Sequence, residues 1–341
     1  MVRALRAVKR FFDDRIGWNR LGIALSVAII AIAAVVLYRI LRDIAFNEVV
    51  EALRATPVHS VVIAGLLVAC AYFTLTFYDL FALRTIGKAH VPYRIAALAG
   101  FTSYSIGHNV GVTVLTGGAV RYRIYSIWGL TVIDVAKICF VAGLTFWLGN
   151  ATLLGLGIAF EPSAASALDQ LPPWLNRIVA VATLAMLSAY IAWVWHKPRV
   201  IGKDDWEVTL PGGPLTLVQI LIGIADLGCC ALAMYVLLPD EPHIAFVTMA
   251  VIFVTATLLG FASAAPGGLG VFDAAMFVAL WQFDRENLLA GLLLFRVLYY
   301  IVPFAIALTI LGIREFWLDV KVLAHHGELP EPPAGEKREE G

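Results

Sequence analysis

The sequence is poor in charge. Only 15% of its 341 residues are charged and 60% are hydrophobic, and the mean hydropathy is +0.83. A soluble domain carries about 25% charged and about 45–50% apolar residues, so the composition predicts an integral membrane protein. The formal net charge is zero, which excludes a nucleic-acid-binding polyelectrolyte and gives no reason to expect a nucleic-acid partner.

Cysteine is also scarce. The four cysteines stand inside apolar stretches, and their spacing matches neither a zinc site nor a disulfide framework. We interpret them as small packing residues, and we expect neither a metal nor a cofactor. They are Cys70, Cys139, Cys229 and Cys230.

Long apolar runs, by contrast, are abundant. A membrane-spanning helix needs about 20 apolar residues, and the runs predict an all-α membrane protein with about eight spans. A further apolar segment, 95–120, contains glycines that break it into a hairpin. The runs are Leu21–Ile40, Val58–Leu83, Leu130–Phe160, Trp174–Trp195, Leu215–Leu238, His243–Ala264, Leu288–Ile313 and the shorter Gly268–Phe283.

The basic residues predict the orientation, because loops rich in Lys and Arg stay in the cytoplasm. Residues 1–20 are basic, whereas Glu161–Pro173 has no Lys or Arg. The basic loops all lie on the cytoplasmic side only if segment 95–120 enters and leaves the membrane on that side. We therefore predict that this hairpin is re-entrant and that both termini are cytoplasmic.

Three regions follow from this pattern: a basic N-terminus at 1–20, a polytopic membrane domain at 21–313 and a cytoplasmic tail at 314–341. Leu21–Ile40 has the length of an uncleaved anchor rather than a signal peptide. The apolar residues of 39–57 are close to helical spacing, which favours a short interfacial helix. From about 325 the tail has too little apolar surface to fold.

Two glycine-rich segments interrupt the apolar runs, one in each half of the chain. The first includes Gly117-Gly118 and the second Gly267-Gly268. Irregular backbone at membrane depth must be buried in protein or line a cavity. Paired breaks of this kind point to the binding site of a transporter. Gly107 and Gly111, four residues apart, favour close helix packing.

Arginines follow the first break. If the chain breaks at Gly117-Gly118, Arg121 and Arg123 lie in the first turns of the next helix, where the helix end already carries partial positive charge. A bound anion would offset that charge, and guanidinium groups match phosphate. The alternative is that these arginines are ordinary positive-inside anchors. The predicted site at this break comprises Asn109, Thr116, Gly117, Gly118, Arg121 and Arg123.

Ionisable residues inside spans are costly and are functional candidates. Arg296 requires an acidic partner or an anionic ligand, and Asp226 and Asp273 are the candidate partners. We expect Pro266 to end one helix and Asp273 to lie in the second turn of the next, as a proton carrier or a switchable partner of an arginine. The predicted second half of the site comprises Asp226, Pro266, Gly267, Gly268, Asp273 and Arg296.

Other charges have simpler interpretations. Asp134 and Lys137 are three residues apart on one helical face, which predicts a structural ion pair. Asp79 lies five residues before Arg84 near a helix end, so either side chain can snorkel to the interface.

The glycine motifs carry a family resemblance. The runs from Ser105 to Gly111, from Leu115 to Tyr125 and from Pro266 to Asp273 together resemble the membrane domain of lysylphosphatidylglycerol synthases, the multiple peptide resistance factors. The resemblance implies an eight-span domain in a bacterial inner membrane that translocates an aminoacylated anionic phospholipid between leaflets. His108 departs from the pattern, which favours a small or polar residue there.

The resemblance also bears on activity and partners. In that family a separate cytoplasmic acyltransferase-like domain makes the lipid from aminoacyl-tRNA, and this sequence has no such segment, so we expect no synthase activity. A membrane phospholipid is the implied partner. A separate synthase protein and a second copy of the chain are further candidates.

Two other functions stay open. One is a membrane enzyme acting on polyisoprenyl phosphates, but such phosphatases place Ser and Arg directly after a Pro-Gly pair, and here Gly268-Leu269 follows. The other is an accessory subunit of a lipid-modifying pathway that transports nothing itself.

Overall fold

The computed structural model describes residues 46–111, 113–197, 199–202 and 206–326. The predicted basic N-terminus, the predicted anchor Leu21–Ile40 and the last residues of the predicted tail lie outside the described residues.

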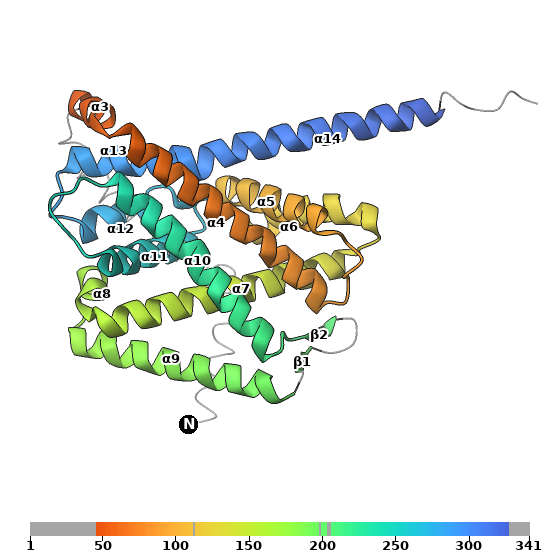
Figure 1. Cartoon of the computed structure of the whole chain (residues 1–341), viewed down its shortest axis with the longest axis horizontal. Helices are drawn as coiled ribbons and strands as arrows, with labels where there is room; N and C mark the ends of the chain where they lie inside the picture. Colours follow the sequence, from red (N-terminus) through yellow and green to blue (C-terminus); the bar gives the residue numbers. More distant parts are fainter. Residues whose placement is uncertain (1–45, 112, 198, 203–205, 327–341) are drawn as a thin grey trace, which may run out of the picture.

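The described chain is helical except for one short β-hairpin (Figure 1). In this hairpin β1 (Val200–Ile201) pairs antiparallel with β2 (Val208–Thr209). Single turns are η1 (Ser126–Trp128), η3 (Pro266–Gly268) and the π-helix η4 (Val297–Ile301). The α-helices are α3 (Phe46–Ala55), α4 (Val58–Thr85), α5 (Tyr93–Val110), α6 (Thr113–Tyr125), α7 (Val132–Phe160), α8 (Pro162–Asp169), α9 (Pro173–His196), α10 (Gly213–Leu237), α11 (Phe246–Ala262), α12 (Val271–Ala279), α13 (Arg285–Arg296) and α14 (Val302–His326).

Five segments of the described chain are long and apolar enough to cross a membrane: α4, α7, α9, α10 and the continuous stretch Arg285–Arg314. Each coincides with a predicted run, so the protein is a multi-pass all-α membrane protein. The other two predicted runs in the described part form shorter apolar helices, Phe246–Ala262 and Pro266–Ala279. The prediction of about eight spans also counts Leu21–Ile40, which is not described.

Two helical hairpins approach each other from opposite ends of α7. The open end of the α5–α6 hairpin lies at the start of α7, because His90 Nε2 is 3.3 Å from the Trp128 carbonyl and Lys88 pairs with Asp134 at 3.2 Å. The open end of the α11–α12 hairpin lies at the other end, where α8 contacts both α11 and α12. Figure 1 shows the two pairs on opposite sides of the molecule.

The tips of the two hairpins meet backbone to backbone. A Cβ added at Gly111 would lie 3.3 Å from Pro266 Cα, and one added at Gly267 would lie 3.7 Å from the His108 carbonyl oxygen. The approach is tight at Gly111, and both glycines have positive φ angles, 85° and 60°, which favour glycine at these two positions.

The first break differs in position from the prediction. α6 runs without interruption through Gly117 and Gly118, and the chain leaves helical geometry at Gly111, where φ is 85°. Helical residues tolerate glycine at a modest cost in stability, so a Gly-Gly pair alone does not end a helix. Gly117 instead lets α6 approach α5, since a Cβ there would lie 3.2 Å from the Ser103 carbonyl oxygen.

The second break lies where the sequence predicts it. α11 ends at Ala262, before Pro266, and positive φ angles follow at Ala264, Gly267, Gly268 and Gly270. Residues with a side chain are disfavoured in the left-handed region of backbone conformation, which explains why three of these four residues are glycine. Asp273 is the third residue of α12, so it lies in the first turn rather than in the predicted second turn.

The long helices α7 and α10 cross at two glycines. A Cβ at Gly149 would lie 2.6 Å from Gly223 Cα, so the backbones touch at this point. One turn away, the Gln219 side-chain amide donates to Thr145 Oγ1 at 2.8 Å. Small residues and a buried hydrogen bond are how helices associate where no hydrophobic force drives them together.

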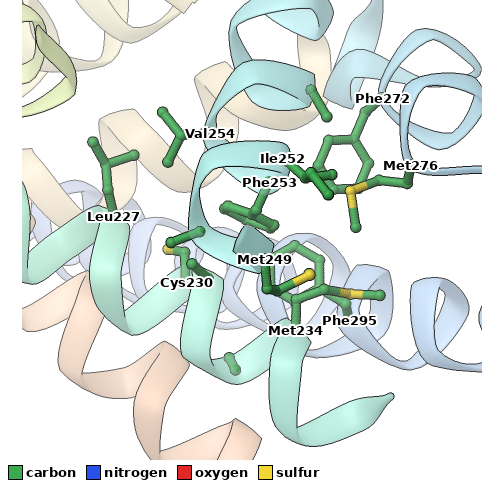
Figure 2. Packing of buried hydrophobic residues seen from close by; sticks show 14 of the residues in the cluster. Leu227, Cys230, Met234, Met249, Ile252, Phe253, Val254, Phe272, Met276 and Phe295 are labelled. Atoms are coloured by element: carbon green, nitrogen blue, oxygen red, sulfur yellow. The ribbon is translucent and has the colours of Figure 1, made fainter. Parts of the chain in front are cut away.

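A large apolar cluster joins α4, α10, α11, α12 and α13, and Figure 2 shows part of it. Phe253 of α11 packs edge-on against both Phe272 and Phe295, with ring centroids 5.6 and 5.4 Å away. Met234, Met249 and other buried side chains fill the remaining space. This packing fixes the second break against the α10 helix.

The π-helix η4 interrupts the last long helix just after Arg296. A π-turn displaces carbonyls from their usual helical partners, and two distant side chains satisfy them. Tyr72 Oη donates to the Tyr299 carbonyl at 2.9 Å, and Asn109 Nδ2 donates to the Tyr300 carbonyl at 3.0 Å. The irregular turn is therefore tied to α4 and to the end of α5.

The helices α3 and α14 lie at the two ends of the described chain. The stretch 39–57 contains the short helix α3, as predicted, and α3 packs against α13 with Val49 buried. At the other end α14 continues past the predicted boundary at 313 to His326.

Candidate functional site

A cavity of about 390 Å³ lies between the two breaks. Its wall includes Gly111 from the first break and Gly267 and Gly268 from the second. It lies beside the central part of α7, from Cys139 to Trp147. Most of the wall is aromatic or aliphatic, and the ionisable groups in it include Arg121, Asp226 and His108.

Arg121 reaches the cavity from α6 but is not unpartnered. Its Nη2 lies 2.7 Å from Asp79 Oδ1, and its Nε donates to the same carboxylate at 3.0 and 3.1 Å. Tyr125 Oη donates to Asp79 Oδ2 at 2.8 Å. Both charged residues are buried, Asp79 completely. The expectation that Asp79 snorkels to the interface is therefore wrong.

The remaining nitrogen of Arg121, Nη1, lies beside Cys139 of α7, which also lines the cavity. Its hydrogen bonds to Asp79 use Nε and Nη2, while Nη1 has a long contact of 4.0 Å with Cys139 Sγ. The guanidinium carbon lies 4.8 Å from the Tyr104 ring centroid. The ion pair is neutral as a unit, but Arg121 lines the cavity, and guanidinium N–H donors are suited to a phosphate or another anion.

The predicted position of the arginines at a helix N-terminus is wrong, because α6 begins at Thr113 and Arg121 lies in its third turn. Arg123 is exposed and does not line the cavity. The charge of the buried Arg121 is compensated by the Asp79 carboxylate, and it does not require an anion bound at a helix N-terminus.

The other residues of the first break hold the tip of the hairpin. Thr116 Oγ1 donates to the Gly111 carbonyl at 3.0 Å, which closes the turn between α5 and α6. Asn109 Nδ2 donates to the Ser105 carbonyl at 2.8 Å as well as to Tyr300. Gly117 and Gly118 pack within α6, and neither lines the cavity.

Arg296 finds its partner in Asp273, one of the two predicted candidates. Nη2 lies 2.6 Å from Asp273 Oδ2 and Nε donates to Oδ1 at 3.0 Å. Arg296 Nη1 also donates to the Gly267 carbonyl at 3.2 Å, and Asp273 Oδ2 accepts from the Gly270 N–H at 3.0 Å. The pair thus holds the glycine turn of the second break in shape.

Asp226 has no cationic partner in the part of the chain that the structure describes. It is 4% exposed, lines the cavity from α10 and accepts a hydrogen bond from Tyr78 Oη at 3.1 Å through Oδ2. Its other oxygen, Oδ1, is buried and has no hydrogen-bond partner among the described residues.

Asp134 forms an ion pair with Lys88 and not with Lys137, so the predicted Asp134–Lys137 pair is wrong. Asp134 lies at the start of α7, where its carboxylate accepts from the Thr131 N–H at 2.9 Å in a capping box and pairs with Lys88. A carboxylate in the first turn of a helix is favoured by the free N–H groups there, which turns it away from Lys137.

Sequence reasoning missed several residues of the site. Tyr104, Tyr299 and Tyr300 line the cavity, and His108 stacks on Tyr299 with centroids 6.0 Å apart. No periodicity separates such aromatics from ordinary core residues. The five-residue step from Asp79 to Arg84 suggested a local relation, while the actual partner, Arg121, is 42 residues away.

Known proteins match the chain across this architecture. An uncharacterised protein of Synechocystis, slr0712, is 31% identical over 247 residues, covering 72% of this chain and 76% of that protein. The inner membrane protein YbhN of Escherichia coli is 28% identical over 71% of this chain and 76% of its own length. No protein-family model matches the chain.

The phosphatidylglycerol lysyltransferase of Staphylococcus aureus is 26% identical over 310 residues, which cover 88% of this chain but 35% of the lysyltransferase. The chain belongs to the family of the phosphatidylglycerol lysyltransferase membrane domain. Membership of this family agrees with the glycine motifs at the two breaks, since the match extends over nearly all of the chain.

Proposed function

We propose that this protein is a lipid transporter that moves an anionic or aminoacylated phospholipid between the leaflets of the membrane. One observation carries the proposal: a cavity at two facing helix breaks has Arg121 in its wall. A cavity of about 300–1,000 Å³ suits a small-molecule ligand, so a volume of about 390 Å³ accommodates a headgroup while the acyl chains stay in the bilayer.

The rim of the cavity supports a lateral route for the lipid. Val114, Trp147 and Phe261 line the cavity and are 71%, 59% and 41% exposed. They come from α6, α7 and α11, so the cavity reaches the outer surface where these helices border it. In a membrane this apolar surface faces lipid tails, which can follow a headgroup without entering water.

The two hairpins supply the moving parts in this proposal. We place α5–α6 as a re-entrant hairpin from the cytoplasmic side and α11–α12 as one from the opposite side, in keeping with the basic loops. Rocking of one half against the other then opens the cavity to alternate leaflets. In this movement the two hairpin tips must slide past each other where Gly111 contacts Pro266.

Relatives support a lipid-related role. The lysyltransferase is named for phosphatidylglycerol, an anionic phospholipid, and YbhN is named as an inner membrane protein. An enzymatic role is less well supported, because the cavity wall contains no serine that could act with His108 among the described residues. A separate synthase partner and a homodimer stay predictions.

The test is a translocation assay in phosphatidylcholine proteoliposomes that contain a fluorescent phosphatidylglycerol or its lysylated form. Dithionite quenches the outer-leaflet probe, and the protected fraction reports movement. Wild-type protein should accelerate the exchange of at least one of these lipids. Unchanged exchange of both lipids would refute the proposal.

A matched pair of variants tests the lateral route. Val114→Trp narrows the rim, whereas Leu115→Trp adds the same bulk at a neighbouring position that is 72% exposed and does not line the cavity. We expect V114W to slow translocation about tenfold, an added barrier of about 1.4 kcal/mol, and L115W to retain the wild-type rate. Equal effects of the two variants would contradict the lateral route.

A further inference from the structure

Three carboxylates are buried around the two breaks, and they are not equivalent. Asp79 is neutralised by Arg121 and Asp273 by Arg296. Asp226 has no ion pair among the described residues, and its hydrogen-bond donor is the neutral hydroxyl of Tyr78. One buried carboxyl group therefore lacks the compensation that the other two have.

The surroundings of Asp226 do not supply a cation directly. Arg121, the nearest arginine in the cavity wall, is committed to Asp79 through two nitrogens. His108 lies on the same wall, stacked against Tyr299. The titratable groups that interact electrostatically with Asp226 are Tyr72 and Tyr78 on α4, Tyr104 on α5, Cys229 and Cys230 on α10, and Tyr299 on η4.

An uncompensated carboxylate at membrane depth is costly, which favours the uptake of a positive charge by Asp226. The geometry limits which charge fits. Oδ1 has less than 1 Å² of accessible surface, so a water-sized probe does not reach it; an ammonium group is no smaller than water, and a hydrated metal ion is larger. A proton has no such size limit.

We propose that Asp226 is a proton-binding site in the cavity and that it takes up its proton together with an anionic headgroup. This proposal rests on the proposed transport function. With a proton on Asp226, the wall presents neutral groups and the N–H donors of Arg121 to the ligand. Without it, a negative charge in the wall repels the headgroup. Because linkage is reciprocal, the anion and the proton strengthen each other's binding.

The consequence for transport is coupling to a proton gradient. The proton comes from water and returns to water, and no covalent bond to the lipid forms or breaks. An anionic lipid and a proton would occupy the cavity together and leave it together, so a proton gradient would drive the lipid in the direction of proton flow.

The first experiment uses infrared spectroscopy on the purified protein without lipid. As the pH is lowered we expect a protonated carboxyl band to appear that is absent in Asp226→Asn, shifted in Asp226→Glu and kept in Asp134→Asn, since Asp134 lies at the start of α7 and does not line the cavity. Absence of such a band in the wild type, or its persistence in D226N, would overturn the proposal whatever the result of the transport assay.

The second experiment is done at a pH where the lipid-free protein lacks that carboxyl band, and it measures proton uptake with a pH dye in weak buffer when short-chain phosphatidylglycerol is added, with binding followed separately by calorimetry. We expect binding by the wild type to be accompanied by proton uptake, and this uptake to be absent in D226N and restored in D226E. Lipid binding without proton uptake would overturn the coupling and leave the transport function standing. Proton release on addition of the lysylated lipid would instead identify Asp226 as an ammonium site and overturn the proposal.

Discussion

Arg121 and Arg296 have corresponding environments in the two halves of the protein. Each guanidinium group binds a carboxylate through Nε and Nη2, while Nη1 contacts another group, Cys139 Sγ for Arg121 and the Gly267 carbonyl for Arg296. The carboxylate thus occupies N–H groups on two of the three guanidinium nitrogens, and the N–H groups on Nη1 are left for other contacts. This division lets a buried ion pair be neutral overall while the arginine keeps N–H groups that do not bind the carboxylate.

Removal of Arg121 tests how much the pair stabilises the fold. Arg121→Met leaves Asp79 buried without its cation, and breaking a buried pair in this way costs about 3–5 kcal/mol. We expect a large drop in the thermal midpoint in detergent. The double variant D79N/R121M should recover much of that loss, because no uncompensated charge remains.

The control for this series is Arg84→Met, since Arg84 is exposed near the end of α4. We expect a change within about 0.5 kcal/mol. If the single and double variants of the pair were equally unstable, the loss of packing rather than the unpaired charge would be the cause.

At the scale of elements, glycine has three different roles that the sequence does not distinguish. Gly111 has a positive φ and ends a helix, Gly117 makes room between α5 and α6, and Gly223 lies at a helix crossing. Only the first role produces a break. The distinction depends on which partner lies opposite each glycine, and that partner is distant in the sequence.

Alanine substitutions test the position of the first break. Gly111→Ala places a Cβ in a backbone region reserved for glycine and 3.3 Å from Pro266 Cα, a strain of about 1–3 kcal/mol. Gly118→Ala meets only Cys139 Sγ at 3.8 Å and should be neutral or stabilising by up to about 1 kcal/mol. Thermal unfolding in detergent measures both, and the reverse order would place the break at Gly117-Gly118 after all.

A second pair tests the α7–α10 crossing. Gly223→Ala brings a Cβ 2.8 Å from Gly149 Cα, so the helices must separate, at about 1–3 kcal/mol. Gly228→Ala, five residues along the same helix, meets nothing within 4 Å and should retain wild-type stability. Comparable melting temperatures for the two variants would show that the crossing is not tightly packed.

The whole molecule shows what sequence can and cannot predict about this class of fold. The apolar runs located the five long helices, because hydropathy reports directly on the solvent. The Pro-Gly-Gly motif located the second break, because proline and left-handed glycine have fixed backbone preferences. The partners of Asp79, Asp134 and Arg296 required tertiary contacts. Spacing along one helix gave the wrong partner for Asp134.

The orientation of the α5–α6 hairpin can be measured by cysteine labelling with a membrane-impermeant maleimide. His90→Cys precedes α5, Ile127→Cys follows α6, and Glu241→Cys lies in the loop between α10 and α11. In inside-out and right-side-out vesicles we expect positions 90 and 127 to label from the cytoplasmic side and position 241 from the other. Labelling of 90 and 127 from opposite sides would refute the re-entrant arrangement.

The backbone contact between Gly111 and Pro266 has a consequence for permeability. Gly111 has no side chain, and a Cβ placed there would lie 3.3 Å from Pro266 Cα. If the two hairpin tips separate at this point, no side chain of Gly111 fills the space that opens between them. Bulk added on either side of this contact is therefore expected to act on leakiness before it acts on folding.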